Sequence, residues 1–302
     1  MLLVSVIICT RNRSASLART LDSIVKAATR VTESWELLVV DNGSTDDTAD
    51  TIAAFADRLP VRRVFEATPG LSNARNAGVR ESRGEFVLWT DDDVLVDENW
   101  LAAWSRAFRN HPDTVVFGGR SRPVYEAPAQ DWFEASEEAL RPLLAIRDEP
   151  EWETIGPGRI PYGLNFAIRG AEQRANLYDP ELGVAPGRRR GGEEQAMILG
   201  LLEQGGSGLW VWDAHVSHII PSDRQTEAYI RLYYLAAGFD KIARGEQRGR
   251  VFAAALTLAR YLRHAAAFRL KRPRSIVDAV PSLVAASLAM GRLRYLLGLN
   301  PA

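Results

Sequence analysis

Three consecutive aspartates interrupt apolar sequence in FVLWTDDDVLVDENW, residues 86–100. The apolar run 86–89 predicts a buried strand, and Asp91, Asp92 and Asp93 follow where that strand ends. Neighbouring carboxylates repel each other, so this arrangement is stable only if a cation lies there or if the side chains point separately into water. Hard divalent cations bind carboxylate oxygens. The triplet is therefore a candidate metal site, with a solvated acidic turn as the structural alternative.

Two further polar residues end apolar runs closer to the N-terminus. Residues 4–10 (VSVIICT) and 35–41 (WELLVVD) predict buried strands that end at Thr10 and Asp41. The carboxyl ends of parallel strands lie at one edge of a sheet, where ligands bind. We therefore expect Thr10, Asp41 and Asp91 at one edge, which independently supports a site at the aspartates.

Strands that alternate with helices must position these side chains. Helical periodicity fills the gaps between the first four expected strands, and a further helix and strand follow within residues 193–220. This alternation predicts an α/β fold with a mostly parallel sheet flanked by helices. Residues 125–161 lose the periodicity and predict a long loop with one helix. The first four expected strands are residues 4–10, 35–41, 61–67 and 86–90.

The composition limits the compartment and suggests two regions. Among 302 residues there is one cysteine, Cys9, which excludes an intrachain disulfide and a cysteine-based metal cluster. This fits a cytoplasmic protein, and the apolar N-terminus lacks the basic region of a signal peptide. Residues 1–224 carry 24 basic and 34 acidic side chains, whereas residues 225–302 carry 13 and 4. We expect a main domain over 1–224 and a basic extension over 225–302.

The basic extension predicts helices to the end of the chain. Basic and apolar residues interleave in VFAAALTLARYLRHAAAFRLKRPR, and the charge-free stretch 279–291 is too short for a membrane span. A basic amphipathic helix can lie on an anionic membrane surface, so one expectation is peripheral association with the inner face of the membrane. The alternatives are a helical cap on the main domain or a contact between two copies. The basic positions are Arg260, Arg263, Arg269, Lys271 and Arg272.

Several motifs in order carry a resemblance to a known family. VSVIICTRNR, LLVVDNGSTDDT, GLSNARNAG, FVLWTDDD, GGEEQAM and HVSHIIP resemble the inverting glycosyltransferases of family two, which have the GT-A fold. The resemblance covers about residues 1–224. It implies a metal-dependent, hexosyltransferase-like enzyme that moves one sugar from a nucleotide-sugar to a hydroxyl acceptor, which is a saccharide, a lipid-linked molecule or a small molecule.

Two other classes remain as alternatives. Nucleotidyltransferases use similar sheets and acidic metal sites, but they usually have a glycine-rich loop after the first strand, and CTRNRSAS has no glycine. A non-catalytic nucleotide-sugar-binding scaffold would not need its reactive residues, so the presence of Asp93, Glu194 and His218 argues against it. The chain also lacks the Gln-x-x-Arg-Trp motif and the several membrane helices of processive synthases in the family, which favours a single addition.

The resemblance implies a donor site and a metal site. Asp41 would accept a hydrogen bond from the nucleobase, with a UDP-sugar favoured over GDP- or dTDP-sugars, and no nucleic acid is expected as a partner. Imidazole suits Mn²⁺ better than Mg²⁺, although either is a candidate cofactor. The implied metal ligands are Asp91, Asp93 and His218. The implied nucleotide-sugar residues are Thr10, Asn12, Arg13, Asp41, Asn73, Arg75, Asp91 and Asp92.

The resemblance also implies a catalytic base. Glu193 and Glu194 lie in the first turn of an expected helix, about 100° apart, so only one faces a bound sugar. The family places the base at the second position, Glu194, where aspartate is more usual. The alternative is that both glutamates only complement the helix dipole. Trp132 and Phe133 are candidates for stacking on an acceptor sugar, or for simple packing.

Overall fold

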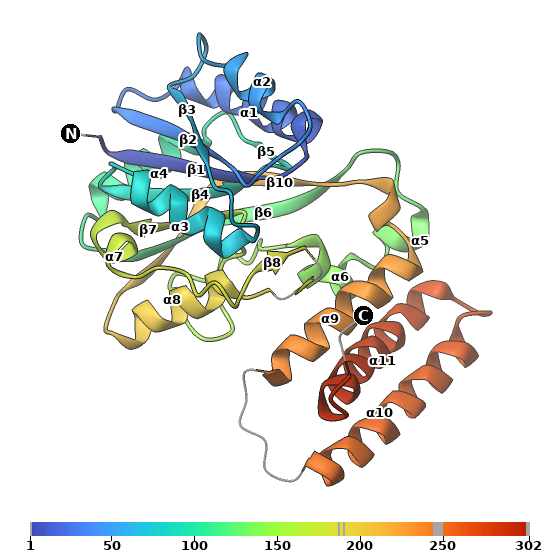
Figure 1. Ribbon diagram of the computed structural model, residues 1–302. Coiled ribbons are helices and arrows are strands. Elements are labelled where there is room, and N and C mark those ends of the chain that lie inside the picture. The colour runs from blue at the N-terminus through green and yellow to red at the C-terminus, as the bar shows by residue number, and fades with distance from the viewer. Residues whose placement is uncertain (1, 187, 190, 244–249, 300–302) are drawn as a thin grey trace. The chain divides into compact units, whose positions relative to one another are not determined.

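Four parallel strands build the N-terminal half of an eight-stranded sheet in the computed structural model, which describes residues 2–186, 188–189, 191–243 and 250–299 (Figure 1). In this half, β1 pairs with β2 and β4, and β2 pairs with β3. Thr10 pairs in register with Asp41, and Cys9 pairs with Asp91, so these strands end at the same edge. The bounds are Val4–Thr10 for β1, Trp35–Asp41 for β2, Val61–Phe65 for β3 and Phe86–Asp91 for β4.

The other half of the sheet contains antiparallel strand pairs. The order continues β4-β7-β6-β10-β5, and β7 runs antiparallel to both β4 and β6, as β10 does to β5. The predicted α/β class is confirmed, but the sheet is mixed rather than mostly parallel. The bounds are Asn165–Arg169 for β7, Val116–Tyr125 for β6, Gly208–Ile220 for β10 and Val94–Val96 for β5.

Helices bury a separate apolar cluster on each face of the sheet. Val6 and Ile8 of β1 pack in one cluster, whereas Ile7 points to the other face, as strand alternation requires. The first cluster holds buried residues of α1 (Ser14–Ala28) and α4 (Trp100–Asn110). The second holds residues of α3 (Leu71–Glu81) and α8 (Glu193–Glu203). Further short elements are α2 (Thr48–Ala53), α7 (Gly170–Ala175), β8 (Val184–Ala185) and β9 (Arg188–Arg189).

Contacts divide the chain into two units. The sheet unit comprises residues 1–124, 145–186 and 192–219, and the remaining residues form the helical unit. Residues 125–144 therefore group with the C-terminal helices, although they precede most of the sheet unit's second half. The predicted boundary after residue 224 stays a prediction.

The helical unit is built around α11 (Ile276–Leu296). This helix packs against α9 (Glu227–Ala243) and α10 (Arg250–Lys271). Gly238 and Gly291 let α9 and α11 approach closely, since a Cβ at Gly291 would lie 1.9 Å from the Leu235 carbonyl oxygen. The unit also contains α5 (Asp131–Glu134), α6 (Glu137–Leu144) and the 3₁₀ turn Ser222–Arg224, so the expected long loop holds two short helices rather than one.

One helix of the described chain is long and apolar enough to cross a membrane. By length and composition α11 passes this test, although its charge-free stretch covers only residues 279–291. Half of its most apolar window is buried inside the protein, which is typical of a core helix and makes the test weak support for a span.

Candidate functional site

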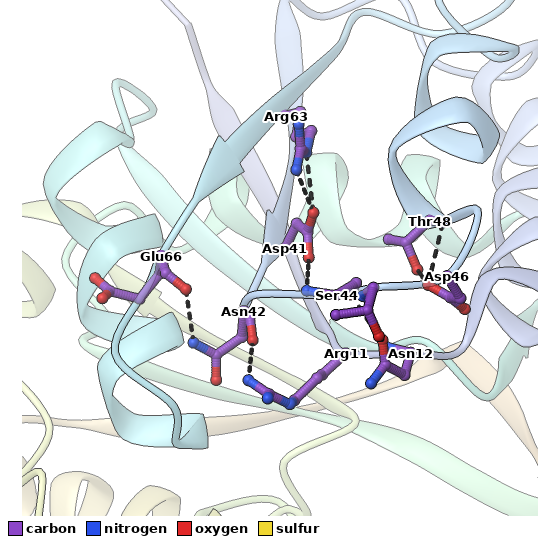
Figure 2. A network of polar contacts seen from close by, with 10 residues as sticks. Arg11, Asn12, Asp41, Asn42, Ser44, Asp46, Thr48, Arg63 and Glu66 are labelled. Atoms are coloured by element: carbon purple, nitrogen blue, oxygen red, sulfur yellow. Dashed lines mark hydrogen bonds and ion pairs between the residues drawn. The ribbon is translucent and has the colours of Figure 1, made fainter.

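Asp41 ends β2 and is held in a fixed orientation. Its Oδ1 accepts a hydrogen bond from the Ser44 backbone N–H (2.8 Å), and its Oδ2 accepts from Arg63 Nε (3.0 Å) (Figure 2). Burial alone raises the pKa of Asp41, but the hydrogen bonds from Ser44 and Arg63 lower it below its ordinary value. Asp41 is therefore an ionised acceptor, and a carboxylate oxygen with one bond retains capacity for another donor.

The loops after β1 and β2 are tied to each other beside Asp41. Asn12 has φ of 52°, in the left-handed region that asparagine tolerates, and its Oδ1 accepts from the Thr45 backbone N–H (2.7 Å). Asp46 accepts from the Ser14 backbone N–H (3.0 Å), which lies in the first turn of α1. These bonds hold the loops after β1 and β2 together beside the strand ends.

The following loop is held by Asn42. Its side chain donates to the carbonyl oxygens of Glu66 (3.0 Å) and Thr68 (2.7 Å) and accepts from the Gly70 N–H (2.8 Å). Arg11 donates to the Asn42 carbonyl oxygen (Figure 2). Asn42 thus fixes the connection from β3 to α3.

The aspartate triplet is paired with Arg13 and Thr10. Arg13 Nη1 donates to Asp92 Oδ1 (2.6 Å), and Arg13 Nη2 donates to Asp93 Oδ2 (2.9 Å). Thr10 Oγ1 donates to Asp92 Oδ2 (2.7 Å). Asp92 and Asp93 are buried, so the triplet is not a solvated surface turn.

The sheet brings His218 to the same place. His218 of β10 pairs in register with Val94, and the Ile219 N–H donates to the Asp93 carbonyl oxygen (2.8 Å). As a result, His218 Nε2 lies 3.7 Å from Asp93 Oδ2. An imidazole and a carboxylate from distant parts of the chain therefore converge.

Positive charge at the triplet falls short of the negative charge. Burial and the charge of Asp93 raise the pKa of Asp91 to about 6. Burial raises the pKa of Asp92 to about 7, although Arg13 opposes this shift. Burial would raise the pKa of Asp93 as well, but His218 and Arg13 lower it well below its ordinary range. A bound cation would stabilise the ionised carboxylates and so lower the pKa values of Asp91 and Asp92.

The donor set fits a hard divalent cation in its chemistry. Within the described residues, no group of three His, Cys, Asp or Glu side chains is arranged to hold a metal ion. The carboxylates of Asp91 and Asp93 and the imidazole of His218 are nevertheless suitable donors for Mn²⁺ or Mg²⁺. Three adjacent carboxylates, with one arginine and one imidazole beside Asp92 and Asp93, are the structural observation that agrees with such an ion.

The two glutamates at the start of α8 have different surroundings. Glu193 is buried, and its Oε1 lies 3.6 Å from Nη1 of the buried Arg75. Glu194 is partly exposed. Burial and the charge of Glu193 raise the pKa of Glu194 to about 7, and Arg75 partly offsets this effect. A carboxylate with a pKa near 7 suits general-base chemistry at neutral pH.

Arg75 lies in an aromatic cage. Its guanidinium carbon is 5.5 Å from the Trp89 ring centroid, 5.7 Å from Phe166 and 5.3 Å from Tyr178. The Arg75 guanidinium thus lies beside Glu193 and three aromatic rings. Its expected place beside a nucleobase stays a prediction. Asn73, two residues earlier on α3, donates to the Pro69 carbonyl oxygen (3.1 Å).

Sequence reasoning did not identify Arg63 or Arg11. Arg63 follows Arg62 in a strand that is otherwise apolar, and this unusual pair of charges was the available signal. Arg63 also lies 5.4 Å from the centroid of Phe65, an exposed aromatic residue at the end of β3. Arg63 and Phe65 therefore join Asp41 at the strand end.

Trp132 and Phe133 belong to the helical unit. Phe133 is completely buried and packs edge-on against Trp132 and Tyr125. The distances between ring centroids are 5.5 Å to Trp132 and 6.0 Å to Tyr125. Trp132 is partly exposed. Of the two candidate acceptor residues, only Trp132 presents ring surface to solvent.

Comparison with known proteins decides the family. The family model described as glycosyl transferase family 2 matches residues 5–161, more than half of the chain. This chain belongs to glycosyl transferase family 2. The match covers β1 to β4 and the aspartate triplet, and it confirms the resemblance seen in the sequence.

Named glycosyltransferases are similar to part of this chain. The validoxylamine A glucosyltransferase of Streptomyces hygroscopicus subsp. jinggangensis is 37% identical over 119 residues, which are 38% of this chain and 28% of that protein. The cholesterol galactosyltransferase of Borreliella burgdorferi is 33% identical over 115 residues, 37% of this chain and 31% of that protein. These matches thus span less than a third of each relative.

Solved structures of similar proteins extend over nearly the whole chain. The mannosyltransferase PcManGT from Pyrobaculum calidifontis, in complex with GDP-Man and Mn²⁺, has a TM-score of 0.60 at 20% identity and covers 95% of this chain and 86% of its own. S. aureus TarS 1-349, in complex with UDP-GlcNAc, has a TM-score of 0.53 at 15% identity, covering 99% and 93%. The similarity shows the fold, and the expected GT-A type is confirmed.

Proposed function

We propose that this chain is a metal-dependent inverting glycosyltransferase that moves one sugar from a nucleotide-sugar to an acceptor hydroxyl. The triplet of Asp91, Asp92 and Asp93 beside His218, of which Asp92 and Asp93 are buried, carries the proposal. Its excess negative charge matches a site for a divalent cation and a diphosphate at the carboxyl edge of the sheet. Membership of family 2 supports the same reaction.

Donor recognition would use the loops at the ends of β1 and β2. Asp41 would accept a hydrogen bond from the base, with its carboxylate oriented by Ser44 and Arg63. Asn12, Arg13 and Asn73 would also contact the donor. We favour a UDP-sugar donor over GDP- and dTDP-sugars, and the TarS complex with UDP-GlcNAc and the PcManGT complex with GDP-Man agree with a nucleotide-sugar of either kind.

Asp91, Asp93 and His218 would hold the metal. When bound, a divalent cation offsets the negative charge of the nucleoside diphosphate as it leaves. Arg13 already offsets part of the charge on Asp92 and Asp93. The chain's own contribution is a fixed set of oxygen and imidazole donors at the end of β4.

Glu194 would act as the base. A carboxylate oxygen of Glu194 takes the proton of the acceptor hydroxyl while that oxygen attacks the anomeric carbon. The bond to the diphosphate breaks on the opposite face, which inverts the configuration at the anomeric carbon. Arg75 would act as a positioning residue, because its contact with Glu193 keeps that glutamate inward.

The proposed acceptor is a hydroxylated saccharide, lipid-linked molecule or small molecule. The two relatives are named for validoxylamine A and for cholesterol, which agrees with a hydroxylated small molecule or a lipid as well as a saccharide. Association with an anionic membrane, expected from the basic extension, concerns the helical unit rather than the transfer site.

Turnover of defined donors tests this proposal. Purified protein with Mn²⁺ should release nucleoside diphosphate from UDP-, GDP- or dTDP-sugars with a panel of hydroxyl acceptors, and the product should have the opposite anomeric configuration by NMR. Asp93→Asn should abolish most of the release, while the exposed Asp22→Asn should not. Pyrophosphate formed from a nucleoside triphosphate and a sugar phosphate would instead identify a nucleotidyltransferase. Binding without any turnover would favour a scaffold.

A further inference from the structure

Helix α10 has one buried side and one exposed side within the helical unit. It packs against α11, and its residues Thr257 and Phe268 are buried. Successive helical residues are about 100° apart, so the residues opposite this buried side can be identified. Among the residues of α10 whose side chains the structure describes, six apolar residues lie on that side, and all six are exposed. We call them the leucine face: Ala255, Leu256, Ala259, Leu262, Ala266 and Leu270.

The leucine face is continuous and protruding. Its six side chains fall within an arc of about 120° around the helix axis. Leu256, Leu262 and Leu270 are 47%, 56% and 66% exposed, and the alanines between them leave these leucines standing out. Leucines this exposed are individually ordinary, but a row of them along one helix face marks an interaction surface.

Basic residues frame the leucine face. Arg263 lies within the arc, Arg260 and Lys271 lie along one border, and Arg269 lies along the other. Residues 250–274 contain seven basic residues and no acidic residue. Among the described residues, no ion pair joins Arg260, Arg263 or Arg269 to a carboxylate, whereas Arg272 pairs with Glu227 at 2.8 Å. The surface is therefore apolar in the middle and strongly positive around it.

We propose that the leucine face of α10 lies on an anionic lipid bilayer. The exposed leucines would enter the boundary between headgroups and acyl chains, and the arginines would contact lipid phosphates. Long basic side chains at such a boundary extend their charged ends to the headgroups while their aliphatic stems cover apolar surface. The proposal concerns the helical unit and does not depend on the transfer reaction.

Charge distinguishes the bilayer from a second copy of the chain. Two leucine faces in contact would bring two sets of arginines together, and the repulsion would oppose association. An anionic surface matches both the apolar and the basic parts of the face. In α11, by contrast, the only exposed residues are Asp278 and Pro281, so its apolar side chains present no comparable row.

Vesicle sedimentation of the full chain tests the proposal. The protein is mixed with vesicles of phosphatidylglycerol and phosphatidylcholine, or of phosphatidylcholine alone, at low and high salt. Leu262→Gln/Leu270→Gln should lower the partition coefficient on the order of tenfold or more, because two exposed leucines lose their favourable transfer into lipid. Arg263→Glu should lower it at least about tenfold through electrostatics.

Matched variants in the sheet unit serve as controls. Leu177 is 48% exposed, so Leu177→Gln makes the same chemical change away from α10 and should leave binding unaltered. Arg83→Glu is the corresponding control for charge. Circular dichroism should show that all variants keep their helix content.

Each other outcome would overturn the proposal. Absence of binding to phosphatidylglycerol vesicles at low salt would do so, as would equal binding to phosphatidylcholine alone. Equal binding by the α10 variants and their controls would place the contact elsewhere. A dimer in analytical ultracentrifugation that Leu262→Gln/Leu270→Gln dissociates, without vesicle binding, would show that a second copy covers the face.

Discussion

At the residue scale, the start of α8 separates two adjacent carboxylates. Glu193 is buried beside Arg75, while Glu194 is partly exposed and has its pKa raised to about 7. Partial burial of the Glu194 carboxylate raises its pKa most, and the negative charge of Glu193 raises it further. The pair therefore gives one glutamate a structural partner and the other a pKa suited to proton transfer.

Glu194→Gln should lower turnover by at least ~10²-fold, the scale of general-base catalysis, while donor binding is kept. In the unaltered enzyme, a base must be deprotonated, so turnover should fall as pH decreases through about 7. Glu193→Gln should reduce turnover much less. Because it removes a negative charge that raises the pKa of Glu194, it should also move the acid limb to lower pH. Steady-state rates across pH measure both effects.

Reversed effects in these two variants would identify Glu193 as the base. Normal turnover in both would place the base elsewhere in the protein and would contradict this mechanism.

At the element scale, Gly84 allows β1 and β4 to meet. Its N–H donates to Ser5 Oγ at 2.7 Å, and a Cβ at this position would lie 2.4 Å from the Ser5 backbone nitrogen and 2.8 Å from the Phe86 carbonyl oxygen. These neighbours are backbone atoms, which cannot move aside as a flexible side chain can. The junction matters for function because Thr10 and Asp91 end these two strands.

Gly84→Ala should lower the free energy of unfolding by about 1–3 kcal/mol, the usual cost of overpacking, and the backbone clash favours the upper end. The midpoint of urea unfolding measures this change. Gly200→Ala is the matched control, because Gly200 lies inside α8 and a Cβ there would meet no atom within 4 Å outside the backbone of its own helix. It should raise the free energy of unfolding by roughly 0.5–1 kcal/mol. An unchanged midpoint in Gly84→Ala would show that the strands can separate without cost.

At the scale of the whole molecule, ligand binding and stability are linked. A ligand that binds only the folded state stabilises it, by about 2.7 kcal/mol at a concentration 100-fold above its dissociation constant. The negative charge of the triplet, in which the pKa values of Asp91 and Asp92 are raised, predicts that a nucleoside diphosphate binds well only together with a divalent cation.

UDP with Mn²⁺ should therefore raise the unfolding temperature by several degrees, and UDP with a chelator should not. Differential scanning fluorimetry compares the two conditions. Asp93→Asn should lose most of the metal-dependent increase, since Asp93 faces both Arg13 and His218. Asp22→Asn should keep it. An equal increase with the chelator would contradict the metal site and leave the nucleotide pocket intact.

Several features of the site follow from local sequence alone. Apolar runs that end in Thr10, Asp41 and Asp91 predict strands, and the register of β1 with β2 and β4 confirms that they end together. Glu193 and Glu194 open a helix as expected. These features depend on periodicity over a few residues, which short segments encode by themselves. The mixed direction of the sheet does not, because β7 and β10 return from long connections whose course no local pattern sets.

Only the tertiary structure decided which side chains meet. Arg63 lies on Asp41 because β3 is the neighbour of β2, and His218 faces Asp93 because β10 pairs antiparallel with β5. The packing of α3 and α8 on one face of the sheet puts Arg75 against Glu193, and its place beside a nucleobase stays a prediction. The sequence likewise determined that α10 is basic and amphipathic, whereas the packing of α11 decided which side of it stays exposed. Such contacts depend on strand register and long-range packing, and residues far apart in the chain specify these jointly.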